Sequence, residues 1–150
     1  MKKINIIGVP SDLGANIRGS CMGPEAIRIA DLVERISRLG YDVTDLGNLN
    51  VPIRETISGN SYLTQIEKIC TELAVITAKS CKKKSIPIIL GGDHSLSIGS
   101  VSGVSSQNSN LGLLWVDTHG DLNTPETSPT QNIHGMPLAT LIGKGHNSLT

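Results

Sequence analysis

The sequence has few of the features that mark nucleic-acid-binding proteins. It contains one Trp, two Tyr and no Phe among 150 residues, so it cannot build the aromatic surface on which unpaired bases stack. Its 13 Lys and Arg residues balance its 13 Asp and Glu residues, which removes the positive field that attracts nucleic acid or an anionic membrane. We therefore expect neither a nucleic acid nor a membrane among its partners.

Cysteine and long apolar runs are also scarce. The three cysteines have no repeating spacing, which argues against a disulfide framework and against a thiolate zinc site. The apolar stretch at residues 4–9 is too short for a signal peptide, and no run reaches the roughly 18 residues of a membrane span. We expect a single globular domain over residues 1–150, in the reducing cytoplasm.

Apolar runs separated by helical periodicity predict an α/β fold. Strands are predicted at residues 4–9, 41–46, 86–90 and 111–116. Because the last two runs are apolar throughout, we expect a mostly parallel sheet with helices on both faces, a three-layer α/β/α arrangement. Ligands of such sheets bind beyond the carboxyl ends of the strands.

Two amphipathic helices are predicted between these strands. One runs from Pro24 to the stop at Gly40, and the other includes residues 66–76 and ends at three lysines that complement the helix dipole. The first helix carries one apolar stripe, formed by Ile29, Leu32, Val33, Ile36 and Leu39. Loops are predicted at 10–23 and 47–60.

Polar residues follow the predicted strand at 111–116. Asp117, His119 and Asp121 alternate, so an extended backbone would place their side chains on one side of the strand end. Carboxylates with imidazole and no thiolate suit Mn²⁺ or a similar divalent cation better than a structural zinc ion. The alternative interpretation is that these residues only end the strand and cap the next loop.

Two further segments add candidate site residues. His94 follows the strand at 86–90 after a Gly-Gly pair, where it can reach the same cavity or serve as a structural hydrogen-bond donor. The segment 123–134 is dense in amides and hydroxyls, which suit a polar substrate and also suit turns. His134 is either a proton-transfer group or a surface loop histidine.

Three motifs in this order resemble those of the arginases, in the ureohydrolase family. Residues 91–95 resemble the family's first metal motif, 117–123 the second, and 132–137 the segment with the histidine near the substrate. Residues 7–14 and 18–24 resemble the family's first strand and loop. The whole chain is therefore similar to the N-terminal half of an arginase.

The resemblance implies a site with two Mn²⁺ ions. His94 and Asp121 would bind one ion, His119 the other, and Asp117 would bridge both. A hydroxide shared by the ions would attack the guanidinium carbon of L-arginine, so that the products are L-ornithine and urea. The expected partner is this small-molecule substrate.

The same resemblance implies roles for the polar loop. His134 would be the proton shuttle to the leaving amine, and Asn123, Thr130 and Asn132 would recognise the α-carboxylate and α-amino groups of the substrate. Recognition of a carboxylate favours arginase over agmatinase, whose substrate has none. Thr118 and Thr130 replace the usual alanine and serine, and neither change removes a ligand.

Length separates this chain from the family. Family chains are considerably longer, and a later strand supplies an Asp-x-Asp pair to the metal site, so we expect a truncated arginase. Two Mn²⁺ ions bring four positive charges against the two negative charges of Asp117 and Asp121, which weakens metal binding. Sheets of the family also place later strands between the third and fourth strands.

Two alternatives to an active arginase remain: an inactive fragment and an agmatinase-like hydrolase. The resemblance further implies that a completed chain would form a trimer or hexamer.

Overall fold

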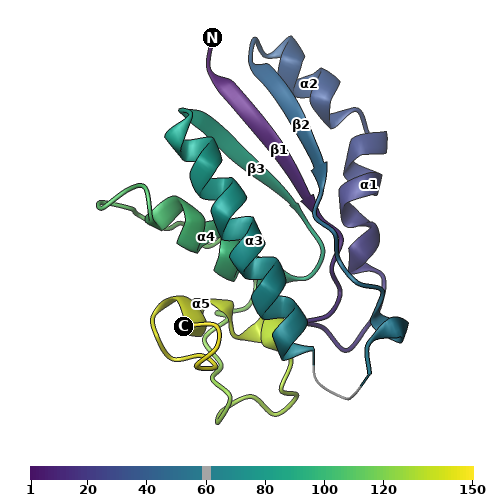
Figure 1. Cartoon of the computed structure of the whole chain (residues 1–150), viewed down its shortest axis with the longest axis vertical. Helices are drawn as coiled ribbons and strands as arrows, with labels where there is room; N and C mark the ends of the chain where they lie inside the picture. Colours follow the sequence, from purple (N-terminus) through teal and green to yellow (C-terminus); the bar gives the residue numbers. More distant parts are fainter. Residues whose placement is uncertain (59–61) are drawn as a thin grey trace.

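The computed structural model describes residues 1–58 and 62–150, and three strands in these residues form a parallel sheet (Figure 1). The strands are β1 (Lys3–Val9), β2 (Asp42–Asn48) and β3 (Ser85–Gly91). Both β2 and β3 pair with β1 in parallel, so the strand order is β2-β1-β3. The three strands predicted before residue 92 are confirmed.

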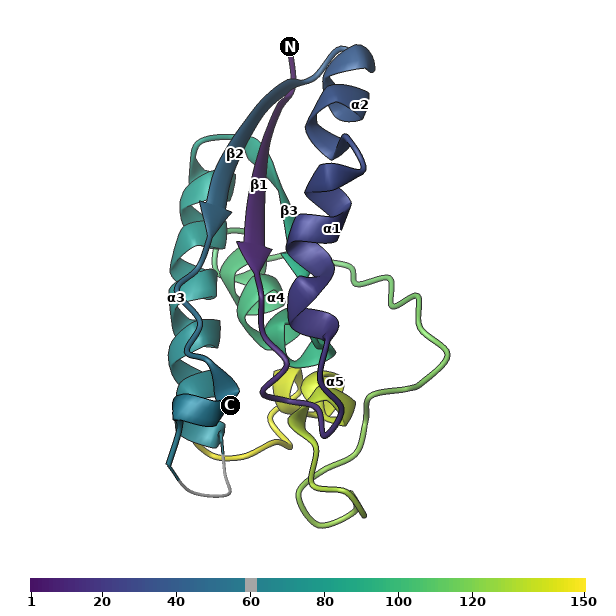
Figure 2. The same cartoon turned by 90° about the vertical axis from the view of Figure 1, so that its right-hand side faces the viewer.

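Helices cover both faces of this sheet (Figure 2). They are α1 (Gly23–Ile29), α2 (Leu32–Arg38), α3 (Leu63–Lys82), α4 (Ser97–Ser105) and α5 (Pro137–Leu141). Helices α1 and α2 lie on one face, α3 and α4 lie on the other, and α5 lies beyond the carboxyl ends of the strands. Short 3₁₀ helices are η1 (Ser20–Met22), η2 (Arg54–Thr56), η3 (His94–Leu96) and η4 (Ile133–Gly135). The predicted three-layer α/β/α class is confirmed.

Strand β1 supplies side chains to two apolar cores, because successive residues of a strand point to opposite faces of the sheet. Ile4 and Ile6 pack with residues of α2 on one face. Ile7 and Val9 belong to the larger core on the other face, which is built mainly with α3. All four side chains are at most 5% exposed. The sheet is thereby fixed between its helical layers, and its carboxyl edge stays open for a site.

The prediction of one continuous helix from Pro24 to Gly40 is wrong. The chain forms α1 and α2 instead, and Asp31 between them has a left-handed backbone with φ of 62°. This break rotates the two halves of the predicted apolar stripe relative to each other. Leu32, Val33 and Ile36 pack on the core. Ile29 and Leu39 are 81% and 75% exposed.

The helix predicted around 66–76 is confirmed as α3, with Lys82 as its last residue. Sequence periodicity predicts neither α4 nor α5. Helix α4 is rich in Ser and Gly because it approaches α3 closely: a Cβ at Gly99 would lie 2.4 Å from Cys70 O, and one at Gly103 would lie 2.5 Å from Ala74 O. Small residues that permit this contact leave no amphipathic pattern to detect.

The predicted strand at 111–116 is wrong. These residues have no regular structure, and Leu114 and Val116 are 86% and 87% exposed. The outer edge of β3 pairs with no strand in residues 1–58 and 62–150. A strand is defined by backbone hydrogen bonds to an adjacent strand, and residues 111–116 make none with β3, so an apolar run alone does not form a strand.

The predicted loops contain short helical turns. Segment 10–23 includes η1, and segment 47–60 includes η2. Residues 59 and 60 of the second predicted loop lie outside the described residues. None of the helices in the described part of the chain combines the length and apolar character needed to cross a membrane.

Candidate metal centre

His94 begins the turn that leaves the carboxyl end of β3. Its backbone carbonyl accepts a hydrogen bond from Ser97 Oγ at 2.7 Å. Its imidazole stacks on the indole of Trp115, with ring centroids 4.6 Å apart and an angle of 24° between the planes. Backbone and ring are therefore both held, and the imidazole is directed toward the polar residues that follow Trp115.

Hydrogen bonds to its backbone carbonyl fix the position of Asp121. Its backbone carbonyl accepts the N–H groups of Leu138 and Ala139, at 3.0 and 3.2 Å, at the start of α5. Its φ of 49° is left-handed, a conformation that Asp tolerates better than most residues. The side chain is buried, with Oδ2 2.7 Å from His94 Nδ1.

Asp117 lies between the two histidines of the predicted site. Its Oδ2 is 3.2 Å from His94 Nδ1, and its Oδ1 is 3.1 Å from His119 Nδ1. Oδ1 also accepts the backbone N–H of His119 at 2.8 Å. This backbone hydrogen bond lowers the pKa of the Asp117 carboxyl; desolvation opposes the effect, and the two imidazoles reinforce it. Asp117 is thus an ionised carboxylate with one oxygen toward each histidine.

His94, Asp117 and Asp121 form a compact group of potential ligands, with one donor atom from each residue within 4.8 Å of the others. Within the described residues, Asp121 Oδ2 is buried and has no hydrogen-bond partner. It lies 2.7 Å from His94 Nδ1, which makes an ion pair with it when the imidazole is protonated. A buried carboxylate oxygen without a donor is costly unless a cation neutralises it. Two carboxylates and an imidazole therefore fit a divalent cation.

The predicted alternation of Asp117, His119 and Asp121 along an extended strand is wrong. Residues 117–119 form a bend, and Asp121 is left-handed, so the three side chains do not share one face of a strand. The side chain of His119 is 77% exposed and contacts only one end of the group, through Asp117. Asp117 and Asp121 meet through tertiary contacts instead.

A cavity of about 560 Å³ opens beside the group. Besides the potential ligands and His119, its walls include Asn123 and His134. The backbone N–H of His134 is fixed by a 3.1 Å hydrogen bond to Gly14 O. Thr130 and Asn132 line a different cavity, of about 380 Å³. The structure thus places six of the eight predicted site residues at one cavity and the other two at a second cavity.

Two residues near the group carry no role in the sequence-based prediction. Trp115 stacks on His94, and Asp93 caps η3 by accepting the Ser95 N–H at 2.9 Å. Asp93 lies within the first motif at 91–95, Trp115 lies two residues before the second motif at 117–123, and Trp115 is the one tryptophan of the chain. The positions of these two residues can be read from the sequence, but their contacts are seen only in the tertiary structure.

The fold and the site together define an α/β protein with a candidate divalent-cation centre at the carboxyl edge of a parallel sheet. A sequence model described as the Arginase family matches residues 2–148. The chain belongs to the arginase family.

Known arginases resemble this chain over nearly all of its length. The arginase of Bacillus subtilis (strain 168) is 48% identical over 151 residues, which cover 99% of this chain and 51% of that arginase. The solved arginase of Bacillus caldovelox has a TM-score of 0.93 at 44% identity, covering 99% of this chain and 52% of that one. The arginase of Entamoeba histolytica, solved in complex with L-ornithine, has a TM-score of 0.86 at 32% identity, covering 99% and 53%. The chain spans about half the length of the curated relatives it matches.

Proposed function

We propose that this site serves manganese-dependent hydrolysis of the guanidinium group of L-arginine to L-ornithine and urea. The observation that carries the proposal is the buried Oδ2 of Asp121, which accepts no hydrogen bond among the described residues and lies beside His94 and Asp117, in a chain that the Arginase family matches over residues 2–148. The likeness to an arginase solved with L-ornithine supports the choice of product.

The proposed ligands are divided between two Mn²⁺ ions. His94 and Asp121 would hold one ion, His119 the other, and Asp117 would bridge them. The position of Asp117 supports this division, because its two oxygens face the two histidines. When bound, the ions would supply a water molecule whose pKa is lowered to about 7.

The remaining residues act on the substrate. His134 lines the cavity beside the proposed ligands and would deliver a proton to the leaving amine nitrogen of ornithine. Asn123, in the same wall, would bind the α-substituents of the substrate, together with Thr130 and Asn132 from the neighbouring cavity. We further propose that the whole protein acts in the cytoplasm as a trimer or hexamer.

Replacement of Asp117 tests this function. Asp117→Asn keeps the shape of the side chain but removes the charge that would bridge the cations, so bound Mn²⁺ and urea release from L-arginine should each fall at least tenfold. Metal content and urea are measured on the 150-residue chain. Asp42→Asn, the same chemical change at an exposed position on β2, should alter neither. Undiminished metal content and urea release in Asp117→Asn would contradict the proposal.

Agmatine separates arginase from agmatinase chemistry. Agmatine lacks the α-carboxylate that Asn123, Thr130 and Asn132 are proposed to bind, so it should release much less urea than L-arginine under the same conditions. Equal rates with the two substrates would favour the agmatinase-like alternative.

A second candidate is that the chain holds the metal motif without hydrolysing arginine. The 77% exposure of the His119 side chain favours this candidate, because a ligand so open to water binds weakly. Mn²⁺ binding that depends on Asp117, with no urea released, would be its signature.

A further inference from the structure

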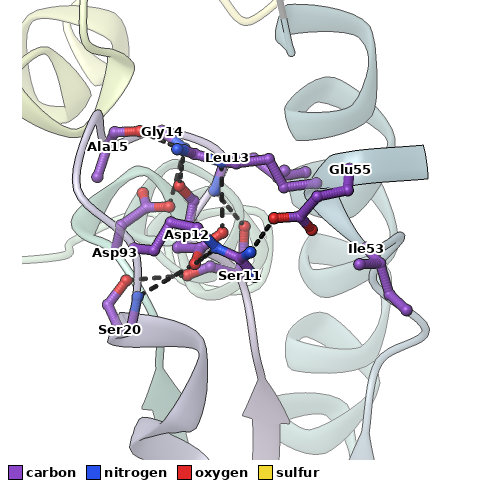
Figure 3. Close-up of polar contacts among 12 residues, drawn as sticks. Ser11, Asp12, Leu13, Gly14, Ala15, Ser20, Ile53, Glu55 and Asp93 are labelled. Atoms are coloured by element: carbon purple, nitrogen blue, oxygen red, sulfur yellow. Dashed lines mark hydrogen bonds and ion pairs between the residues drawn. The ribbon is translucent and has the colours of Figure 1, made fainter. Parts of the chain in front are cut away.

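We propose that Asp93 is a positioning residue that couples the backbone of His94 to the backbone of His134 through Gly14. The proposal rests on the proposed function insofar as both histidines belong to its site. The coupling itself is a property of the chain without metal. Figure 3 shows the Asp93 carboxylate against the loop that contains Gly14.

Both oxygens of the Asp93 carboxylate are occupied by backbone donors. Oδ2 accepts the Gly14 N–H at 2.9 Å, and Oδ1 accepts the Ser95 N–H at 2.9 Å. The residue is 5% exposed, and its own N–H donates to Ser11 O at 2.8 Å. It is not part of the compact group formed by the potential metal ligands. Asp93 therefore acts on the backbone around it.

The hydrogen bond from the Ser95 N–H to Asp93 Oδ1 positions the backbone of His94. Asp93 caps the turn η3, in which His94 is the first residue, and so sets the direction in which the chain leaves β3. Gly92, which precedes Asp93, packs closely against the backbone of Ser11: a Cβ at Gly92 would lie 1.8 Å from Ser11 O. Little room remains for the His94 backbone to move while these contacts persist.

The hydrogen bond from the Gly14 N–H to Asp93 Oδ2 connects Asp93 to the backbone of His134. Gly14 donates its N–H to Asp93, and its carbonyl accepts the His134 N–H at 3.1 Å. Gly14 also lies tightly against its partner: an added Cβ would be 2.4 Å from Asp93 Oδ1. Two hydrogen bonds in series thus connect the Asp93 carboxylate to the first residues of η4.

Charge makes Asp93 suited to this role. A buried carboxylate forms shorter and stronger hydrogen bonds to backbone N–H groups than a neutral acceptor does, and its two oxygens can serve two segments at once. Gly14 precedes Asp93 by 79 positions in the sequence. Displacements of about 1 Å between reacting groups are enough to lower activity strongly, so such a link matters to a site built from both histidines.

Amide hydrogen exchange of the complete, metal-free chain tests the coupling. In Asp93→Ala the Gly14 N–H loses its acceptor directly, and the His134 N–H loses the support of Gly14 O. We expect exchange at the His134 amide to accelerate at least tenfold relative to the amide of Leu73, a fully buried residue of α3. Gly14→Ala perturbs the same contact from the other side, should have the same effect, and decides the matter if Asp93→Ala does not fold.

Ser80→Ala is the matched control. Ser80 is 2% exposed, and its Oγ accepts a hydrogen bond from Asn5 Nδ2 at 3.0 Å, away from the site. Its loss should not accelerate exchange at His134 selectively. The proposal is overturned if His134 and Leu73 accelerate equally in the folded site variants, or if Ser80→Ala reproduces their selective effect.

Manganese binding distinguishes this proposal from the proposed function. Because Trp115 stacks on His94, its emission should change when Mn²⁺ binds to the wild-type chain, and Asp93→Ala should weaken that binding at least tenfold. No change of Trp115 emission with Mn²⁺ in the wild-type chain would count against the proposed function, and the exchange result would stand on its own.

Discussion

Asp93 and Asp121 are carboxylates of similar burial with opposite hydrogen bonding. Asp93 is 5% exposed and both of its oxygens accept backbone N–H groups. Asp121 is 6% exposed, and its Oδ2 accepts no hydrogen bond. Because a buried carboxylate needs compensation in either case, the first is compensated by the chain and the second is available to a cation. At the scale of single residues, this difference separates a positioning group from a candidate ligand.

Burial also determines the chemistry of a residue outside the site. Burial raises the pKa of the thiol of Cys70, a residue of α3, to about 12. We predict that iodoacetamide at pH 8 leaves Cys70 unmodified in the folded chain, because the thiolate is the reactive form. Peptide mass spectrometry measures the labelling. In concentrated urea Cys70 should react, and equal rates in the folded and unfolded chains would refute the prediction.

At the scale of elements, short helices depend on contacts with the sheet. Helix α1 has seven residues, too few to be stable alone. Arg28 near its end forms two hydrogen bonds to Asp45 of β2, at 2.7 and 2.9 Å, and a third to Asn48 Oδ1 at 2.6 Å. These bonds join α1 to an edge strand that is otherwise largely exposed.

The pair of Arg28 and Asp45 gives a prediction with a defined pH dependence. The hydrogen bonds from Arg28 lower the pKa of the Asp45 carboxyl below its ordinary value of 3.8. The stabilisation is therefore present above pH 3.8 and is lost as the pH falls through the lowered pKa of the folded state. Asp45→Asn should reduce the free energy of unfolding by about 1–3 kcal/mol at pH 7.

Chemical denaturation at two pH values checks this prediction. The difference between wild type and Asp45→Asn should shrink toward zero as the pH is lowered below the folded-state pKa of Asp45. Asp42→Asn, on the same strand and exposed, should leave stability at pH 7 unchanged. A difference that grows on acidification would show that the ion pair is not its origin.

At the scale of the whole molecule, the described residues combine exposed apolar side chains with an unpaired sheet edge. Leu113, Leu114 and Val116 are 48%, 86% and 87% exposed, and Ile86 of β3 is 47% exposed. The outer edge of β3 has no partner strand within residues 1–58 and 62–150. Exposed apolar residues together with an open strand edge favour pairing with another chain.

We therefore predict that the chain associates with itself as its concentration rises. Replacing both Leu114 and Val116 by Ser should lower the mass-average size in light scattering, because it removes most of the exposed apolar surface of that segment. Leu39→Ser, which changes a leucine that is 75% exposed at the end of α2, should have little effect. An unchanged size in the double variant, or an equal decrease in Leu39→Ser, would contradict this explanation.

Particular elements show how far sequence patterns reach. Strands β1 and β3 follow from their apolar runs, and α3 follows from its periodicity, because these signals are local. The same rule fails at 111–116, where the apolar run pairs with no strand among the described residues although the outer edge of β3 is open. It also fails at Asp31, whose left-handed backbone divides one predicted helix into two.

The candidate site divides in the same way. Motif spacing and family resemblance name His94, Asp117, His119 and Asp121 as candidates from the sequence alone. Which carboxylate oxygen accepts no hydrogen bond depends on residues far along the chain. The Gly14 N–H donates to the Asp93 carboxylate, and N–H groups at the start of α5 donate to the Asp121 carbonyl. Sequence determined which residues are candidate ligands and the order of the elements up to β3. Only the tertiary structure decided which of those residues meet, because burial and hydrogen bonding between distant segments arise once the chain has folded.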